Sequence, residues 1–254
     1  RYLEDYFPSS LFSTIHESGH ALYELGIDPH PEYRGTRLAE AASMAVHESQ
    51  SRLWENIIGR SHAFWEHHFP AVAALLGEAG ENLDLDSFVA SINRVVPSLI
   101  RTEADEVTYG LHVIARFELE SALFEGNLKV QDVPEAWRAA YRELLGIASP
   151  DDRNGCLQDV HWSMGAFGYF PSYALGNLYA AQFWGTLRAQ LPVVETRIAA
   201  GETRCVLDWL RTNIHQRGQS LTPGELVETV TGSALDPVWF ERYLREKYSR
   251  IYGF

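Results

Sequence analysis

The chain has 254 residues, of which 46% are hydrophobic and 22% are charged, and its 21 basic and 34 acidic side chains give a formal net charge of −13. This length suffices for a substantial core and corresponds to one large domain or two small ones. The negative charge argues against a nucleic-acid backbone and against an anionic membrane surface as partners. The longest apolar runs, such as Ala71–Gly77, are far shorter than the roughly 18 residues of a membrane-spanning helix.

Two further features narrow the class of protein. Arg1–Ser10 holds neither a basic stretch nor an apolar stretch, so we expect no signal peptide. Cys156 and Cys205 are the only cysteines, and their spacing forms neither a disulfide framework nor a metal clip. These features predict a soluble, cytoplasmic, globular protein.

Apolar residues recur with helical spacing along nearly the whole chain. Ser9 or Ser10 is expected to cap a first helix that ends at Gly26. Thr36 is expected to cap a long second helix that continues to about His68. The same spacing predicts further helices over Asp86–Leu99, Ile100–Glu125, Pro134–Gly146, Ser172–Arg188, Val193–Gln216, Thr222–Thr229 and Asp236–Tyr248.

The remaining patterns support the same fold class. Ser149–Phe170 is the longest stretch without helical spacing, and it contains one proline and several glycines. The chain has no alternating β-branched run, no internal repeat and no shift in composition that would mark a boundary. We therefore predict an all-α fold in a single domain over residues 1–254.

The motif H-E-x-x-H occurs at His16–His20, inside the first predicted helix. Residues i and i+4 lie on one helical face, so the imidazoles of His16 and His20 can reach one ion. Glu17 is rotated by about 100° from His16, which places its carboxylate beside the metal, where it can take a proton from a metal-activated water. The alternative is a surface helix with two solvated histidines.

A catalytic zinc also needs a third protein ligand. Glu24 continues the face of the two histidines by one turn, which favours a neighbour rather than a ligand. A polar cluster at His47–Gln50 lies within an otherwise mixed apolar segment, and such a cluster is either buried with a partner or a solvated face. Spacing alone leaves the choice open among Glu24, Glu40, His47, Glu48 and Glu55.

Several segments match the motifs of one family in the right order. His16–Gly26 is followed by His47–Asn56, Ile100–Asp105 matches I-R-x-x-A-D, and Gly155–Trp162 matches G-x-x-Q-D-x-H-W. Together with Phe167–Gln182, they make the chain resemble the carboxypeptidase Taq family of zinc-dependent metallocarboxypeptidases. This resemblance implies a multi-helix peptidase-type fold with the metal site between two long helices. It also implies that Glu48 is the third ligand and that the metal is Zn²⁺, with Co²⁺ as the alternative.

The resemblance covers the C-terminal half of such an enzyme. Family members are about twice as long and carry two further motifs, H-P-F and D-x-R-x-T, upstream of H-E-x-x-H. Arg1 and Tyr2 are similar to the residues that follow D-x-R-x-T. The N-terminal half of the family is therefore expected to be missing from this chain.

The resemblance also implies roles for residues outside the metal site. Arg101 would bind the terminal carboxylate of the substrate, a task that suits a guanidinium; the alternative is an ion pair with Asp105 at i+4. Asp105 would then orient Arg101 or act as an anchor. His161 would stabilise the oxyanion. Tyr169 and Tyr173 are alternative hydroxyl donors that also contact the substrate; the alternative for these two is a place among the core aromatics.

Asp159 is a further candidate site residue outside the metal ligands. Asp159 is expected to orient an imidazole that binds the metal. The expected function is a metal-dependent carboxypeptidase that releases C-terminal residues from peptides, with Glu17 as general base. The alternative is a metal-binding but catalytically silent chain, or an incomplete half that needs its N-terminal portion. The expected partners are peptides with a free C-terminal carboxylate, and a homodimer is a further implication of the resemblance.

Overall fold

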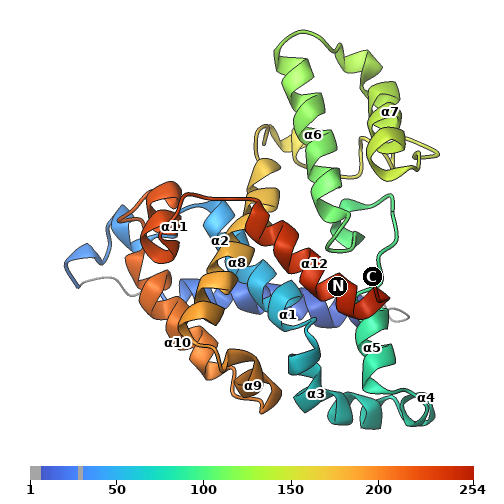
Figure 1. Cartoon of the computed structure of the whole chain (residues 1–254). Coiled ribbons are helices and arrows are strands. Elements are labelled where there is room, and N and C mark those ends of the chain that lie inside the picture. The colour runs from blue at the N-terminus through green and yellow to red at the C-terminus, as the bar shows by residue number, and fades with distance from the viewer. Residues whose placement is uncertain (1–6, 28–30) are drawn as a thin grey trace. The chain divides into compact units, whose positions relative to one another are not determined.

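The computed structural model describes residues 7–27 and 31–254 (Figure 1). These residues form helices and loops without a strand, which confirms the all-α prediction. They fall into two compact units: residues 7–27, 31–92 and 175–254 make up the first, and residues 93–174 make up the second. The boundary falls inside helix α8 (Pro171–Gln190).

The first unit begins with α1 (Phe7–Glu24), which packs against α2 (Met44–Arg52) and against the π-helical segment η3 (Leu53–Ile58). α1 already starts at Phe7, so the serine caps expected at its beginning are wrong. α2 starts after Ser43, whose hydroxyl accepts a hydrogen bond from the Val46 N–H group.

The long helix expected from Thr36 to about His68 is wrong. Thr36 caps only a short 3-10 turn, η2 (Arg37–Ala39). The helical conformation ends again after η3. A new helix, α3 (His62–Leu75), begins after Ser61, whose hydroxyl accepts a hydrogen bond from the Phe64 N–H group. Serine side chains at these caps satisfy backbone donors that a continuous helix would pair internally, so one apolar pattern is divided into separate helices.

The other long helix expected in the first unit, Val193–Gln216, is also divided. Gly201 has a φ of +82°, a conformation that glycine adopts easily and that ends a right-handed helix. The core of this unit contains buried side chains such as Val46, Phe183 and Leu210. The remaining helical elements are α4 (Glu78–Glu81), α5 (Leu85–Ile92), α9 (Val194–Ala199), α10 (Arg204–Asn213), α11 (Pro223–Thr231) and α12 (Val238–Tyr252), with the 3-10 turns η1 (Pro31–Tyr33) and η7 (His215–Arg217).

The second unit contains two packed helices, α6 (Tyr109–Phe124) and α7 (Val133–Leu145), which lie side by side in Figure 1. Pro134 lies in the first turn of α7 and Gly146 ends it with a φ of +71°, as the sequence predicts. The helix expected over Ile100–Glu125 begins only at Tyr109 and is preceded by η4 (Arg101–Glu103).

The rest of the second unit is mostly loop. The segment expected to lack helical spacing contains only the 3-10 turn η6 (Trp162–Met164), and η5 (Val130–Asp132) precedes α7. Among the described residues of both units, no helix combines the length and the apolar character that crossing a bilayer requires.

Candidate functional site

Two of the expected metal ligands lie on α1. His16 and His20 are one turn apart and share the face that packs on α2. Gly19 lies at this contact, where a Cβ atom would stand 2.6 Å from Ser51 Cα and 2.9 Å from the carbonyl oxygen of Gln50. Because these atoms belong to the backbone of α2, glycine is what allows the two helices to approach so closely.

Glu48 on α2 completes a cluster with the two histidines. Its side chain is buried, and Oε2 lies 3.7 Å from His16 Nε2 and 3.6 Å from His20 Nε2. The three residues each offer one ligand atom, and these atoms lie within 4.8 Å of one another. In the described parts of the chain, this is the one cluster of metal-ligating side chains with such a geometry. Two imidazole nitrogens and one carboxylate oxygen suit a catalytic Zn²⁺.

The other nitrogen of each imidazole is already engaged. His16 Nδ1 lies 2.9 Å from Glu55 Oε2, and since a carboxylate only accepts, Nδ1 donates. His20 Nδ1 lies 2.6 Å from His47 Nδ1, and His47 Nε2 lies 2.8 Å from Glu24 Oε1. The imidazoles of His16 and His20 therefore present Nε2 to Glu48, which is the orientation that a shared ion would need.

Charged neighbours set the ionisation of this cluster. Arg52 donates from Nε to Glu48 Oε1 at 2.7 Å and also lies close to Glu55. Burial alone would raise the pKa of Glu55, but the hydrogen bond from His16 and the charges of Arg52 and Arg60 lower that pKa to about 2. Burial and the nearby His16 and His47 lower the pKa of His20, so its imidazole is neutral at pH 7, as metal binding requires.

Glu17 differs from its neighbours because its side chain is exposed to solvent. It follows His16 directly, so its carboxylate points about 100° away from the metal-facing direction. Its charge still reaches His20 and raises the pKa of that imidazole, although burial outweighs this effect. An exposed carboxylate beside the cluster is accessible to water.

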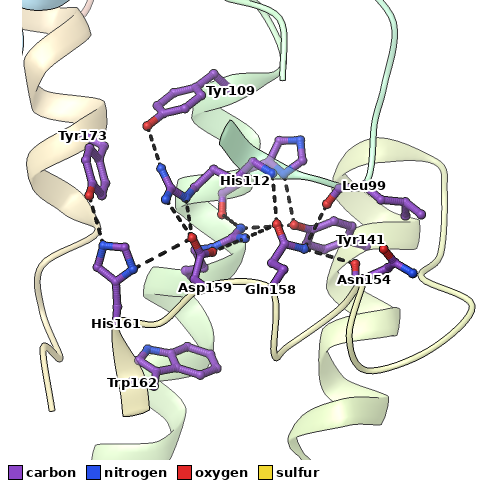
Figure 2. A network of polar contacts seen from close by, with 12 residues as sticks. Leu99, Tyr109, His112, Tyr141, Asn154, Gln158, Asp159, His161, Trp162 and Tyr173 are labelled. Atoms are coloured by element: carbon purple, nitrogen blue, oxygen red, sulfur yellow. Dashed lines mark hydrogen bonds and ion pairs between the residues drawn. The ribbon is translucent and has the colours of Figure 1, made fainter. Parts of the chain in front are cut away.

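The site residues expected beyond position 100 lie in the second unit. Figure 2 shows three of them, Asp159, His161 and Tyr173, within one network of polar contacts. Arg101 is 5% exposed, and its Nε and one terminal nitrogen donate to Asp159 Oδ1 at 3.2 and 2.7 Å. Its other terminal nitrogen donates to the Tyr109 hydroxyl at 3.0 Å. These three bonds use three of the five N–H groups of the guanidinium.

Asp159 also binds a second guanidinium, which sequence reasoning missed. Arg116 is fully buried on α6 and reaches Asp159 Oδ2 from Nε at 2.7 Å and from a terminal nitrogen at 2.6 Å. Burial would raise the pKa of Asp159, but hydrogen bonds and charge from Arg101 and Arg116 lower it. Gln158 Oε1 accepts from the Arg101 backbone N–H group at 2.9 Å and from Arg116 at 2.8 Å, which links the two arginines again.

His161 lies at the edge of this network. Its Nε2 is 3.0 Å from the Tyr173 hydroxyl, and its Nδ1 is 3.9 Å from Asp159 Oδ1. The Tyr169 ring lies 5.5 Å from the His161 ring, and the Arg101 guanidinium lies 4.6 Å from the Tyr173 ring centre. The structure therefore brings together five residues of the sequence-based site: Arg101, Asp159, His161, Tyr169 and Tyr173.

Asp105 serves the beginning of α6. Its Oδ1 accepts from the Val107 and Thr108 N–H groups, both at 2.9 Å, and its Oδ2 accepts from the Thr108 hydroxyl at 2.8 Å and from the Val96 N–H group at 3.1 Å. The ion pair that the structure gives Arg101 is with Asp159. These contacts make Asp105 an anchor of the backbone before α6.

Sequence reasoning also missed which side chains contact the outer nitrogens of His16 and His20. Two of the ligand candidates that spacing leaves open contact the expected ligands instead: Glu55 contacts Nδ1 of His16, and His47 contacts Nδ1 of His20. Asp159, expected to do this, contacts the two arginines of its own unit. Glu55 lies seven positions after Glu48, a spacing of two turns that could have placed it on the same helical face.

Comparisons with known proteins point to one family. A family described as Carboxypeptidase Taq (M32) metallopeptidase matches residues 1–248. The chain is 51% identical over 253 residues to Thermostable carboxypeptidase 1 of Thermus thermophilus. This match covers 100% of this chain and 49% of that protein. It is 42% identical over 252 residues to Carboxypeptidase 1 of Bacillus subtilis, which covers 99% of this chain and 50% of that protein.

Comparison with solved structures points to the same family. The crystal structure of an M32 carboxypeptidase from Deinococcus radiodurans R1 is similar with a TM-score of 0.96 at 45% identity, covering 100% of this chain and 51% of that chain. The chain thus spans about half the length of the curated relatives it matches.

Proposed function

Since the chain belongs to the carboxypeptidase Taq (M32) family of metallopeptidases, we propose that it acts in a metal-dependent carboxypeptidase that releases residues from the C-termini of peptides. One observation carries this proposal: two imidazole Nε2 atoms and a buried carboxylate converge, while their outer atoms are held by other side chains. Such prior fixing of the donors is typical of a metal site and is not needed on a solvated helix face.

The proposed metal ligands are His16, His20 and Glu48, and the proposed metal is Zn²⁺, with Co²⁺ as an alternative that this donor set also accepts. When bound, such an ion polarises a peptide carbonyl and lowers the pKa of a water molecule. Glu55 and His47 keep the two imidazoles turned toward the site, and Arg52 keeps Glu48 in place.

Glu17 is the proposed general base. Its exposed carboxylate takes a proton from the attacking water and delivers that proton to the leaving amine. A side chain with this task needs access to water and to the substrate, and the exposure of Glu17 supports this assignment.

We assign recognition of the terminal carboxylate to Arg101. The three bonds to Asp159 and Tyr109 hold its guanidinium in one orientation, and two N–H groups lie outside those bonds. Although burial opposes the charged form, Tyr109 and Asp159 raise the pKa of Arg101, so the cation persists. His161, Tyr169 and Tyr173 are assigned contacts with the substrate, with His161 as the donor to the oxyanion.

A second candidate function is metal binding by residues 1–254 without turnover of peptides. These residues span about half the length of the relatives that they match. In that case the N-terminal portion of the family would be needed for activity. A homodimer and a cytoplasmic location stay predictions.

The test is mass spectrometry of a defined peptide incubated with the chain and added Zn²⁺ or Co²⁺. We expect a ladder of products shortened from the C-terminus, and none from the same peptide with an amidated C-terminus. Glu17→Gln should abolish the ladder while metal binding persists, whereas Glu81→Gln, at another exposed glutamate of the same unit, should leave it intact. Metal binding without any cleavage by the unsubstituted chain would support the second candidate.

A further inference from the structure

We propose that His47, backed by Glu24, is a positioning residue that fixes the tautomer and the ring orientation of His20, so that His20 Nε2 faces the metal. The inference rests on the metal site proposed above. It extends that site by an outer chain of two side chains, neither of which contacts the ion.

For two neutral imidazoles with a metal on His20 Nε2, the distances select one arrangement of protons. His20 Nδ1 and His47 Nδ1 are 2.6 Å apart, so one of them must donate and the other must accept. A metal ligand needs a free lone pair on Nε2, which places the His20 proton on Nδ1. His47 then accepts with Nδ1 and carries its own proton on Nε2, which lies 2.8 Å from Glu24 Oε1 and donates to it.

The opposite arrangement fails at both ends. If a neutral His47 donated from Nδ1, its Nε2 would have no proton and would face the Glu24 carboxylate lone pair to lone pair. His20 would then carry its proton on Nε2, the atom that lies 3.6 Å from Glu48 Oε2 and that the metal needs. The Glu24 carboxylate thus selects, through His47, the binding tautomer of His20.

Packing holds the chain of side chains in place. The His47 side chain is 13% exposed, and its ring meets the Tyr23 ring edge-on with 5.1 Å between centres. Tyr23 is itself fixed, since its hydroxyl accepts from the Ala42 N–H group at 3.2 Å. His47 immediately precedes Glu48 on α2, so one helix turn supplies a ligand and the support of another ligand.

The two ligand histidines are therefore held differently. His16 donates directly to Glu55, a carboxylate that is 13% exposed and ionised. His20 donates to a second imidazole, and its carboxylate is one step further out, on a side chain that is 59% exposed. Support of His20 thus depends on a residue that can be replaced without disturbing Glu55.

The test compares two replacements of His47. His47→Leu removes the acceptor, whereas His47→Asn keeps an oxygen close to the position of Nδ1. We expect the affinity for Zn²⁺, measured by competition with a chelator, to fall about 10- to 100-fold in His47→Leu and to recover largely in His47→Asn. Glu24→Gln, at an exposed position, should give a smaller loss in the same direction. His67→Leu replaces an exposed histidine of the same unit and serves as the control.

A second readout does not need the metal. Nitrogen-15 NMR of the imidazoles in the metal-free chain should find His20 with its proton on Nδ1 in the unsubstituted chain and in His47→Asn, and a mixture of tautomers in His47→Leu. If His47→Leu binds Zn²⁺ as tightly as the unsubstituted chain and keeps the same tautomer, the inference is wrong. The metal site itself would survive that result if His16→Ala still loses Zn²⁺. Failure of the unsubstituted chain to bind Zn²⁺ would overturn both.

Discussion

Asp159 accepts hydrogen bonds from two buried guanidinium groups, so a single carboxylate compensates two cations. Asp159→Asn keeps the shape of the side chain but leaves Arg101 and Arg116 facing a neutral amide. Removing one partner of a buried ion pair costs about 3–5 kcal/mol, because the other charge stays buried and uncompensated. We expect urea unfolding of this variant to show a loss of about that size.

An exposed ion pair in the same unit provides the control. Asp152 accepts from Arg138 at 2.7 Å, but its side chain is 44% exposed. Asp152→Asn should therefore cost at most about 1 kcal/mol, as exposed pairs do. Equal losses in the two variants would contradict the view that burial sets the importance of Asp159.

Arg101 gives a prediction on substrate recognition, under the proposed function. Arg101→Lys keeps a positive charge but cannot hold Asp159, Tyr109 and a substrate carboxylate with one planar fork. Loss of a charged hydrogen bond of about 1.5–3 kcal/mol corresponds to a fall in kcat/KM of about 10- to 100-fold on peptides with a free C-terminus. Arg138→Lys should have no such effect. Trimming by Arg101→Lys at the unsubstituted rate would show that carboxylate recognition lies elsewhere.

At the scale of elements, the contact between α1 and α2 brings together His16, His20 and Glu48, the proposed metal ligands. A Cβ atom on Gly19 would stand 2.6 Å from Ser51 Cα, and backbone cannot yield as a flexible side chain can. Gly19→Ala should separate the helix with His16 and His20 from the helix with Glu48. We expect a loss of stability of about 1–3 kcal/mol and a fall in Zn²⁺ affinity of about tenfold or more.

The same substitution elsewhere in the unit is the matched comparison. Gly224 lies in α11 with open space around its missing Cβ, so Gly224→Ala should leave metal affinity unchanged. Gly176→Ala on α8 is a third variant for this comparison, because a Cβ atom there would stand 2.5 Å from Glu48 Cγ. Calorimetric titration with Zn²⁺ measures the metal affinity of all three glycine variants. Unchanged affinity in Gly19→Ala would mean that the helices can separate without moving the ligands.

The elements also show what the sequence could and could not predict. The first helix and the paired faces of His16 and His20 follow from a local period, and Gly146 ends α7 as its sequence indicates. The choice of Glu48 came from family resemblance, because spacing does not determine how two helices pack. Contacts between residues far apart in the chain were missed: His16 meets Glu55 across 39 positions, and Arg116 meets Asp159 across 43.

At the scale of the whole chain, each unit contains a fully buried neutral histidine. His215 lies in the first unit, where burial and the nearby Arg211 lower its pKa from 6.5 to about 3. His112 lies in the second unit, where burial and the charges of Arg116 and Arg101 lower its pKa to about 3 as well. Neither imidazole accepts a proton in the folded state until the pH is far below the usual range.

These two histidines make stability dependent on pH. Below pH 6.5 the unfolded chain binds a proton at each histidine, whereas the folded chain does so only near pH 3, so acid favours unfolding. Each histidine should therefore remove up to about 1.4 kcal/mol of unfolding free energy per pH unit in this window. The carboxyl of Glu55, with its pKa lowered to about 2, adds a further loss at the acid end.

Substitution of His215 isolates one of these contributions. His215 Nε2 donates to Gln50 Oε1 at 3.0 Å, and His215→Gln places an amide N–H group near that position without a titrating ring. Denaturant unfolding measured at intervals between pH 7 and pH 4 should show a shallower fall in stability for His215→Gln than for the unsubstituted chain, by about 1.4 kcal/mol per pH unit at most. His67→Gln, at an exposed histidine, should follow the unsubstituted chain. A slope that stays the same in His215→Gln would mean that His215 gains its proton in the folded state as readily as in the unfolded one.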